Sequence, residues 1–376
     1  MARIQEFYKG RRKRRNYAIV PFVIVLGIAV LTVVLFYSMQ QYAVITKEGI
    51  TVELPLLNEE KTVIDSEGNE VKVFDPVDVT LQFDEPDYSS VKATAGSKAQ
   101  GLRAIFVPAD NINKEKLTEY ANRLNTGNAL VLEMKPRSGV LKWNSQATMA
   151  VNYGISQENE ATLQLPTLIT ELKAKNIYLV AQLSCCLDEL LASRCTSVTL
   201  RNEYGGNYTD DYGTWLDAYN TDLRNYIVQL TREMYDMGFD EVVLADVAHP
   251  VFAEPVALTY TRQMSTQPSA VNAVCGFAMY VSDALRERSV NQLSIYIDSP
   301  QALVKAVDNG QDARLFIKVF DRVYLRTDRF AYSYNLADLK PQITIGTGQD
   351  RLIPVMENYL FENASEMSWV LVDVAE

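Results

Sequence analysis

The chain has 376 residues, of which 48% are hydrophobic and 22% charged, proportions typical of a globular protein with a substantial core. Its formal net charge of −11 disfavours binding to nucleic acid, because like charges repel at long range. We therefore expect one large folded domain or two ordinary ones, and no nucleic-acid partner.

The first 38 residues predict a membrane anchor. Residues 17–37 carry no charge, and this run is long enough to cross about 30 Å of hydrocarbon as a helix. Residues 1–16 hold seven Arg and Lys against one Glu, a charge of +6, which favours a cytoplasmic location for that end. A cleaved signal peptide is the alternative, but its apolar core is usually shorter and ends at a small-residue cleavage site. We expect a basic cytoplasmic tail over residues 1–16, a transmembrane anchor over 17–38 and a single-pass protein of the cell membrane. The remaining chain, with a charge of −17, would be extracytoplasmic.

Residues 39–96 predict a short β-rich stalk. Residues 50–57 and 61–74 alternate in part between apolar and polar side chains, and the SEGN sequence at 66–69 is typical of a hairpin turn. Residues 84–100 are polar and small, as in a loop. This segment is expected to be a spacer.

From residue 101 onward, segments typical of buried strands alternate with segments typical of amphipathic helices. Eight strands are predicted, at residues 101–108, 128–135, 176–184, 240–247, 291–298, 320–327, 341–348 and 368–374. Helices are predicted between them, at residues 113–125, 166–175, 221–238, 269–289, 300–310 and 351–364. This alternation predicts an α/β fold, a (β/α)8 TIM barrel over residues 97–376. An open doubly wound sheet is the alternative, but residues 106–113 lack its glycine-rich turn.

Catalytic groups of such barrels lie at the carboxyl ends of the strands. Glu133, Asp246 and Asp298 occupy such ends, and glycoside cleavage requires a carboxyl pair acting as acid and as base or nucleophile. Polar and aromatic side chains at these ends and in the following loops are candidates for binding a glycan: Lys135, Trp143, Gln182, Asp188, Trp215, Tyr219 and His249. No His/Cys spacing of a zinc site is present, so we expect neither a metal nor a cofactor.

Four cysteines lie at positions 185, 186, 195 and 275. The adjacent pair is poorly placed to form a disulfide with itself, because one peptide link constrains its geometry. A bond from Cys195 to Cys185 or Cys186 and a set of buried free thiols both remain open.

Four stretches resemble a bacterial family of glycosyl hydrolase-like domains of unknown function, a TIM barrel distantly similar to the α-amylase-type enzymes. They are LVLEMKPRSGVL (130–141), LKAKNIYLVAQLSCCLDELLA (172–192), WLDAYNTDLRNY (215–226) and GFDEVVLADVAHP (238–250). The similarity covers roughly residues 97–250, and the remainder resembles the family only in architecture. The resemblance implies that Asp217 binds substrate beside Trp215 and Tyr219. At Lys135 and Asp188 the chain has the same residues as the family.

Other positions depart from the family pattern. Glu133 stands where the family has an Asp in its second strand, and Gln182 where it has an Arg in its third. In the fourth strand, Ala245 stands at the position of the family's Asp, and Ala248 at the position of a second Arg. Because side chains alternate along a strand, Asp246 is expected to face away from the barrel mouth unless a bulge redirects it. These losses indicate an inactive copy or a relocated site.

Two functions therefore remain open. The first is an anchored glycoside hydrolase-like enzyme of the cell envelope, in which Glu133 acts with Asp246 or Asp298 and Lys135 orients the polysaccharide. The second is a catalytically inactive barrel that binds glycan or a protein partner at the cell surface.

Overall fold

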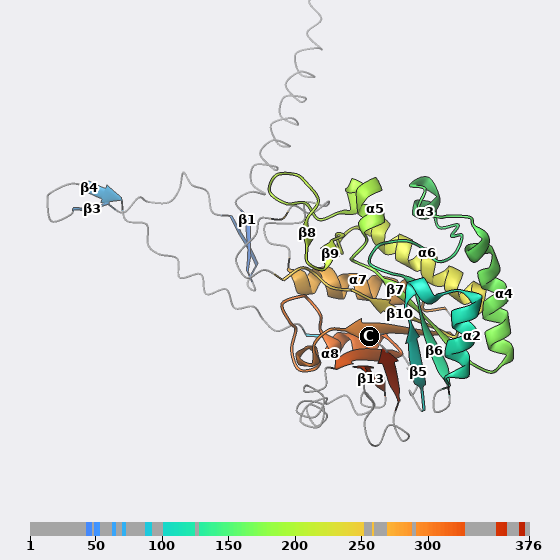
Figure 1. The fold of residues 1–376 in the computed structure, drawn as a ribbon. Coiled ribbons are helices and arrows are strands. Elements are labelled where there is room, and N and C mark those ends of the chain that lie inside the picture. The colour runs from blue at the N-terminus through green and yellow to red at the C-terminus, as the bar shows by residue number, and fades with distance from the viewer. Residues whose placement is uncertain are drawn as a thin grey trace, which may run out of the picture. The chain divides into compact units, whose positions relative to one another are not determined.

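The computed structural model describes residues 43–46, 49–52, 62–64, 70–72, 87–91, 101–124, 128–251, 258, 269–287, 291–327, 351–358 and 368–372 (Figure 1). The chain divides into two compact units, Met1–Glu85 and Pro86–Glu376. The predicted cytoplasmic tail and the predicted anchor lie outside the described residues. Within the described part of the chain, no helix is both long and apolar enough to cross a membrane.

Two short antiparallel hairpins belong to the first unit. Strand β1 (Ala43–Thr46) pairs with β2 (Gly49–Val52), and β3 (Thr62–Ile64) pairs with β4 (Glu70–Lys72). Both hairpins lie in the segment expected to be a β-rich stalk, and β3 and β4 flank the turn predicted at residues 66–69.

The second unit contains a closed barrel of eight parallel strands. In chain order they are β5 (Arg103–Val107), β6 (Ala129–Lys135), β7 (Tyr178–Ser184), β10 (Glu241–Ala245), β11 (Gln292–Ile297), β12 (Arg322–Thr327), β13 (Leu352–Glu357) and β14 (Trp369–Val372). The barrel closes where β14 pairs with β5, with Trp369 opposite Arg103. This closure confirms the predicted TIM barrel and excludes an open sheet.

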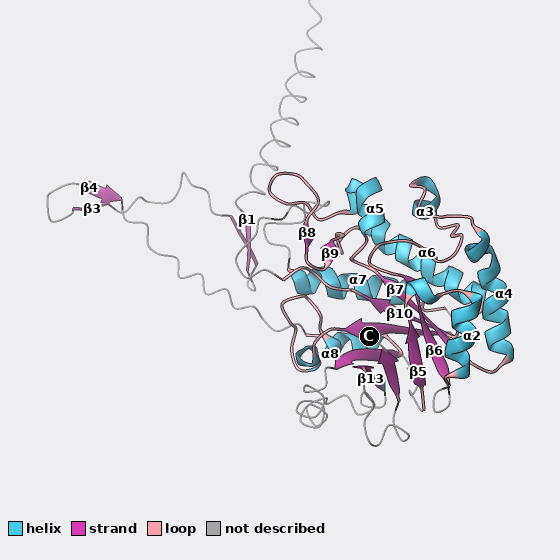
Figure 2. Cartoon of the chain, in the orientation of Figure 1, coloured by secondary structure: helices cyan, strands magenta, loops and turns pink. Residues whose placement is uncertain are grey.

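Helices lie outside the ring of strands, as Figure 2 shows. They are α2 (Lys114–Asn122), α3 (Thr148–Asn152), α4 (Glu160–Ala174), α5 (Glu189–Arg194), α6 (Thr221–Met237), α7 (Ala270–Ala284) and α8 (Ala313–Val319). Asparagine side chains cap α2, α4 and α6, and Gly238 ends α6 with a left-handed φ of 106°. A two-stranded hairpin, β8 (Thr209–Asp210) and β9 (Gly213–Thr214), lies in the long connection between α5 and α6.

The barrel interior is filled by apolar side chains and closed at its amino end by a polar cluster. Glu241 accepts hydrogen bonds from the hydroxyls of Tyr178 (3.0 Å), Ser294 (2.5 Å) and Tyr324 (2.9 Å). It also forms an ion pair with Arg322. Each of these residues lies at or near the start of its strand, so the cluster lies far from the carboxyl ends where chemistry is expected.

The seventh strand is not where the sequence predicted it. Residues 352–357, assigned to a helix, form β13, and the predicted strand at 341–348 lies outside the described residues. Leu352, Ile353, Val355 and Met356 are all buried, because the strand packs against the helix layer on one face and the interior on the other. A strand buried on both faces has no alternating pattern to distinguish it from a helix.

Two helix predictions also need correction. The helix expected at 300–310 is a short 3₁₀ turn, Pro300–Leu303, and the helix preceding β12 is instead α8. Helix α4 begins at Glu160, six residues before Pro166, because Asn159 and Thr162 form a capping box there.

Candidate active site

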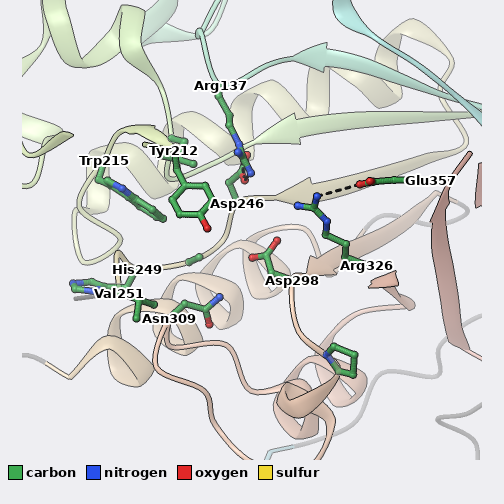
Figure 3. Close-up of a pocket in the computed structure, with 13 residues that line it drawn as sticks. Arg137, Tyr212, Trp215, Asp246, His249, Val251, Asp298, Asn309, Arg326 and Glu357 are labelled. Carbon is green, nitrogen blue, oxygen red and sulfur yellow. Dashed lines mark hydrogen bonds and ion pairs between the residues drawn. The ribbon is translucent and has the colours of Figure 1, made fainter. Parts of the chain in front are cut away.

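A cavity of about 480 Å³ opens at the carboxyl ends of the barrel strands (Figure 3). This volume lies within the usual range for small-molecule sites. Charged and apolar side chains line it: Arg137, Leu187, Tyr212, Trp215, Asp246, Ala248, His249, Val251, Asp298, Pro300, Asn309, Arg326 and Glu357. Four of the residues proposed from sequence are among them, namely Asp246, Asp298, Trp215 and His249.

Asp246 points into the cavity because its backbone is left-handed. Val243 faces the barrel interior, so strict alternation would turn Ala245 inward and Asp246 outward. Strand β10 ends at Ala245, however, and Asp246 has a φ of 52°. The carboxylate is thereby redirected to the mouth, by a left-handed residue rather than a bulge.

Two donors hold the Asp246 carboxylate. The Arg137 guanidinium donates to Oδ1 from Nε (3.0 Å) and Nη2 (2.6 Å). The hydroxyl of Ser184, the last residue of β7, lies 2.6 Å from Oδ2. Charge-assisted bonds of this kind are the stronger class of hydrogen bond, so the orientation of Asp246 is well defined.

Asp298 follows β11 and lies in a different environment. Burial, and next the negative charge of Asp246, raise the pKa of Asp298 to about 6, against the opposing effect of Arg137 and Arg326. The buried Gln311 side chain accepts the Asp298 N–H (3.0 Å) and donates to Oδ2 (3.2 Å). Figure 3 shows Asp298 and Asp246 pointing into the same cavity.

Aromatic side chains form the other wall of the cavity. Tyr212 is 62% exposed, and the Arg137 guanidinium lies 5.8 Å from its ring centroid. Trp215 donates from Nε1 to Asp210 (2.7 Å), which also accepts the Tyr212 N–H (2.9 Å). Asp210 therefore orients both rings toward the cavity.

His249 is the chain's single histidine and lines the same wall. Its Nδ1 donates to the Pro250 carbonyl (2.9 Å). Burial lowers the pKa of His249, which favours the neutral imidazole near pH 7. The histidine is thus suited to hydrogen bonding with a neutral ligand.

Lys135 and Glu133 do not line the cavity. The pairing of β6 with β7 shifts register between these two residues, so that Glu133 lies opposite Gln182 but Lys135 lies opposite Leu183. This bulge turns Lys135 out of the interior into the helix layer, where it pairs with Asp188 at 2.8 Å. Glu133 stays inside the barrel and accepts the Ala109 N–H at 3.0 Å, and burial raises its pKa.

The other residues proposed from sequence stabilise loops. Trp143 is buried and donates from Nε1 to Glu233 (2.7 Å), on the outer face of the barrel. Buried Asp217 accepts the Tyr219 N–H (2.9 Å), and the Tyr219 hydroxyl donates to the Ser269 carbonyl (2.9 Å). Gln182 lies inside the barrel, in the same layer as Val243. None of these side chains lines the cavity, so the structure does not place them to contact a ligand there.

Several cavity residues were not proposed as site residues from sequence. All three charged ones lie at the carboxyl end of a strand: Arg137 just after β6, Arg326 next to last in β12, and Glu357 last in β13. The expectation that functional groups lie at these ends therefore applies to them as it does to the carboxylates. Arg326 and Glu357 form an ion pair at 3.1 Å. Glu357 could not be found because its strand was assigned to a helix.

No cluster of three or more His, Cys, Asp or Glu side chains suited to a metal ion occurs within the described residues. All four cysteines are buried free thiols. Burial raises the pKa of Cys186 to about 12, which makes it an unreactive thiol at neutral pH.

Comparison with known families decides the classification. Residues 104–324 match the family described as "Putative glycosyl hydrolase domain". The chain belongs to this family. The match spans β5 to β12, more than half of the chain, and includes all four stretches that resemble such domains in sequence.

Of two similar solved structures, the first below supports the fold of this family member. The glycoside hydrolase domain of PgaB (BpsB) from Bordetella bronchiseptica is 12% identical with a TM-score of 0.52, covering 72% of this chain and 94% of that one. A hypothetical protein from Ruminiclostridium thermocellum is 21% identical with a TM-score of 0.43, covering 51% and 96%. At these identities the likeness concerns the fold alone. No curated protein sequence matches this chain.

Proposed function

We propose that this glycoside hydrolase-like barrel cleaves a polysaccharide of the cell envelope, with Asp298 as general acid and Asp246 as base or nucleophile. The observation that carries the proposal is the pair itself. Two carboxyl groups line one cavity at the carboxyl ends of the strands: Asp246 is held by Arg137 and Ser184, and Asp298 has a pKa raised to about 6. Glycoside hydrolysis requires such a pair.

The assignment of roles follows from the surroundings of each group. With a pKa raised to about 6, Asp298 retains its proton in mildly acidic conditions and can transfer it to a leaving oxygen. Asp246 is held by Arg137 at 2.6 Å and by the Ser184 hydroxyl at 2.6 Å, and a base or nucleophile requires such a fixed orientation. Glu133, the acid expected from sequence, does not line the cavity and takes no part in this assignment.

The lining also suits a sugar ring. Tyr212, Trp215 and Val251 offer apolar faces to the cavity, and charged side chains such as Arg137 and Asp298 offer hydrogen-bonding groups. Such a division of apolar and polar lining is typical of binding sites for small polar ligands. A glycan is the ligand class that this family membership supports.

A second candidate, a glycan-binding barrel without activity, is favoured by one observation. Ala245 occupies the fourth-strand position where the resembling family carries its Asp, and it is nearly buried. If Asp246 does not take over the catalytic role of that Asp, the cavity can bind a glycan but cannot cleave it.

One experiment separates the two functions. Purified full-length chain in mild detergent is incubated with cell-wall and storage polysaccharides, and the release of reducing ends is measured. Hydrolysis that Asp246→Asn and Asp298→Asn both abolish supports the enzyme, with Asp211→Asn, an exposed loop carboxylate, as the matched control. No release by the wild-type chain, with saturable glycan binding weakened by Tyr212→Ala, supports the binding module.

The proposed location rests on the amino-terminal sequence. A cytoplasmic basic tail and an uncleaved apolar span at residues 17–38 would keep the barrel outside the cytoplasm, attached to the membrane. The barrel would then face the envelope polysaccharide that it is proposed to cleave.

A further inference from the structure

A buried ion pair lies behind the proposed site. Lys135 Nζ is 2.8 Å from Asp188 Oδ2, and both side chains are 0% exposed. Lys135 Nζ also donates to the Ser184 carbonyl (2.7 Å), and Asp188 Oδ1 accepts the Leu191 N–H (2.7 Å) at the start of α5. The pair therefore joins the ends of β6 and β7 to α5.

Both donors to Asp246 are connected to this pair. Ser184 is bonded to Lys135 through its carbonyl and to Asp246 through its hydroxyl. The Arg137 carbonyl accepts the N–H of Glu189, the residue that follows Asp188 (3.1 Å). The backbone carbonyl of Ser184 is thus held by the buried pair itself, and that of Arg137 by the residue next to it.

The space around the pair is filled. Gly139 has a φ of 80°, and a Cβ at that position would lie 1.9 Å from Asp188 Oδ1. The Ser138 carbonyl accepts the Leu190 N–H at 3.1 Å, which closes the loop after β6 over α5. Lys135, Gly139 and Asp188 belong to the stretches that resemble the family, yet none of them lines the cavity.

We propose that Ser184, held by the Lys135–Asp188 pair, is a positioning residue that fixes Asp246 for catalysis. This inference rests on the proposed function of Asp246. The Ser184 hydroxyl has two acceptors in reach, Asp246 Oδ2 at 2.6 Å and the Leu187 carbonyl at 2.9 Å. Donation to Oδ2 fixes the rotation of the Asp246 carboxylate, and the Leu187 carbonyl is the other acceptor within reach of the same hydroxyl.

Other charged and titratable groups interact electrostatically with Asp246. They are Arg137 and Glu133 from β6 and its loop, Cys185 and Cys186 after β7, and Tyr296 and Asp298 from β11 and the residue after it. None of them is altered by Ser184→Ala, so a change in that variant reports the hydroxyl.

The test compares kcat and KM of full-length Ser184→Ala with those of the wild-type chain. Without the hydroxyl, Oδ2 of Asp246 loses a donor and the carboxylate is less often in the reactive orientation, while the surfaces that bind substrate are untouched. We expect kcat to fall about tenfold with little change in KM. Ser184→Thr, which retains the hydroxyl, should restore kcat, and Ser193→Ala, an exposed serine of α5, should leave both constants unchanged.

The ion pair is tested with the double variant Lys135→Met/Asp188→Asn. This change removes both buried charges together and leaves a side-chain oxygen to cap α5, so the fold is better preserved than with one unpaired charge. A folded double variant should lose about tenfold in kcat with unchanged KM. Wild-type kcat in that variant would exclude the pair from the positioning role.

The inference can fail separately from the proposed function. If wild-type hydrolysis is abolished by Asp246→Asn but Ser184→Ala leaves kcat unchanged, or Ser184→Thr fails to restore it, the inference is wrong. If the wild-type chain hydrolyses nothing, the proposed function fails. The link between Ser184 and Asp246 is then decided by the chemical shift of the Asp246 carboxyl carbon, assigned by its loss in Asp246→Asn. A chemical shift that Ser184→Ala leaves unchanged would also overturn the inference.

Discussion

Asp298 is the residue whose proton is proposed to reach the leaving group. General acid catalysis contributes about 10²–10⁴-fold, so Asp298→Asn should lower kcat/KM by that factor on a polysaccharide. The loss should be far smaller on an aryl glycoside with an acidic phenol, because that leaving group departs without a proton. Comparing the two substrates decides the role, and equal losses on both would contradict it.

The pH profile provides a second prediction at the same scale. An acid must be protonated to act, so activity should fall as the pH rises through the Asp298 pKa of about 6. The positive charge of Arg326 lowers that pKa, and Arg326→Met should move the basic limb upward by roughly half a unit. If the basic limb of Arg326→Met stays in place or moves to lower pH, a group other than Asp298 determines that limb.

Gly139 tests the packing behind the site. Gly139→Ala combines a left-handed backbone with a Cβ 1.9 Å from Asp188 Oδ1, whereas Gly205→Ala has a similar φ of 78° with no atom within 4 Å. Backbone strain costs each variant about 1–2 kcal/mol, and overlap adds roughly 1–3 kcal/mol to the first. Thermal unfolding should therefore show a Tm several degrees lower for Gly139→Ala than for Gly205→Ala. Equal Tm values would mean that the loop relaxes away from Asp188.

At the scale of elements, the β8–β9 hairpin is predicted to determine how a glycan chain binds. Tyr212, in its turn, lines the cavity, while Tyr204 is 88% exposed in the same connection and does not. Tyr212→Ala should raise KM for an oligosaccharide by about tenfold, because a stacking surface of this size contributes about 1 kcal/mol or more. Tyr204→Ala should leave KM unchanged. Equal effects in both variants would exclude a stacking role for the hairpin.

The strand order could be predicted because helices and strands alternate along most of the chain. Strands β5, β6, β7, β10, β11, β12 and β14 were predicted within a few residues of their observed bounds. Strand β13 was not, since Pro354 and residues buried on both faces made the segment resemble the start of a helix. Such a segment is recognised only through its partners, here Leu325 opposite Pro354.

The candidate site was predicted less completely, for two backbone reasons. The bulge in β6 moved Lys135 into the helix layer, although its place at the end of the second strand had made it a candidate for binding a glycan. The left-handed φ of Asp246 did the opposite and turned an outward position inward. Neither a bulge nor a positive φ at a non-glycine residue has a reliable signature in a single sequence.

For the molecule as a whole, the two ends of the barrel differ in how their charges are partnered. At the amino end, Glu241 is fully buried and bonded to three hydroxyls and a guanidinium, which is an arrangement for stability. At the carboxyl end, Asp246, Asp298 and Arg326 face an open cavity, and the charge of one changes the pKa of another. This division is the one expected of a barrel whose carboxyl end carries the function.

The amino-terminal segment makes the last prediction. If residues 17–38 are an uncleaved anchor, the full-length chain should sediment with membranes, resist extraction by high salt and alkaline carbonate, and dissolve in detergent. A chain that lacks residues 1–41 should remain in the soluble fraction when produced without an export signal. Mass spectrometry of the mature amino terminus provides the control. A terminus beyond residue 37 would show that the apolar run is a cleaved signal peptide, and the barrel would then reach its polysaccharide as a released protein.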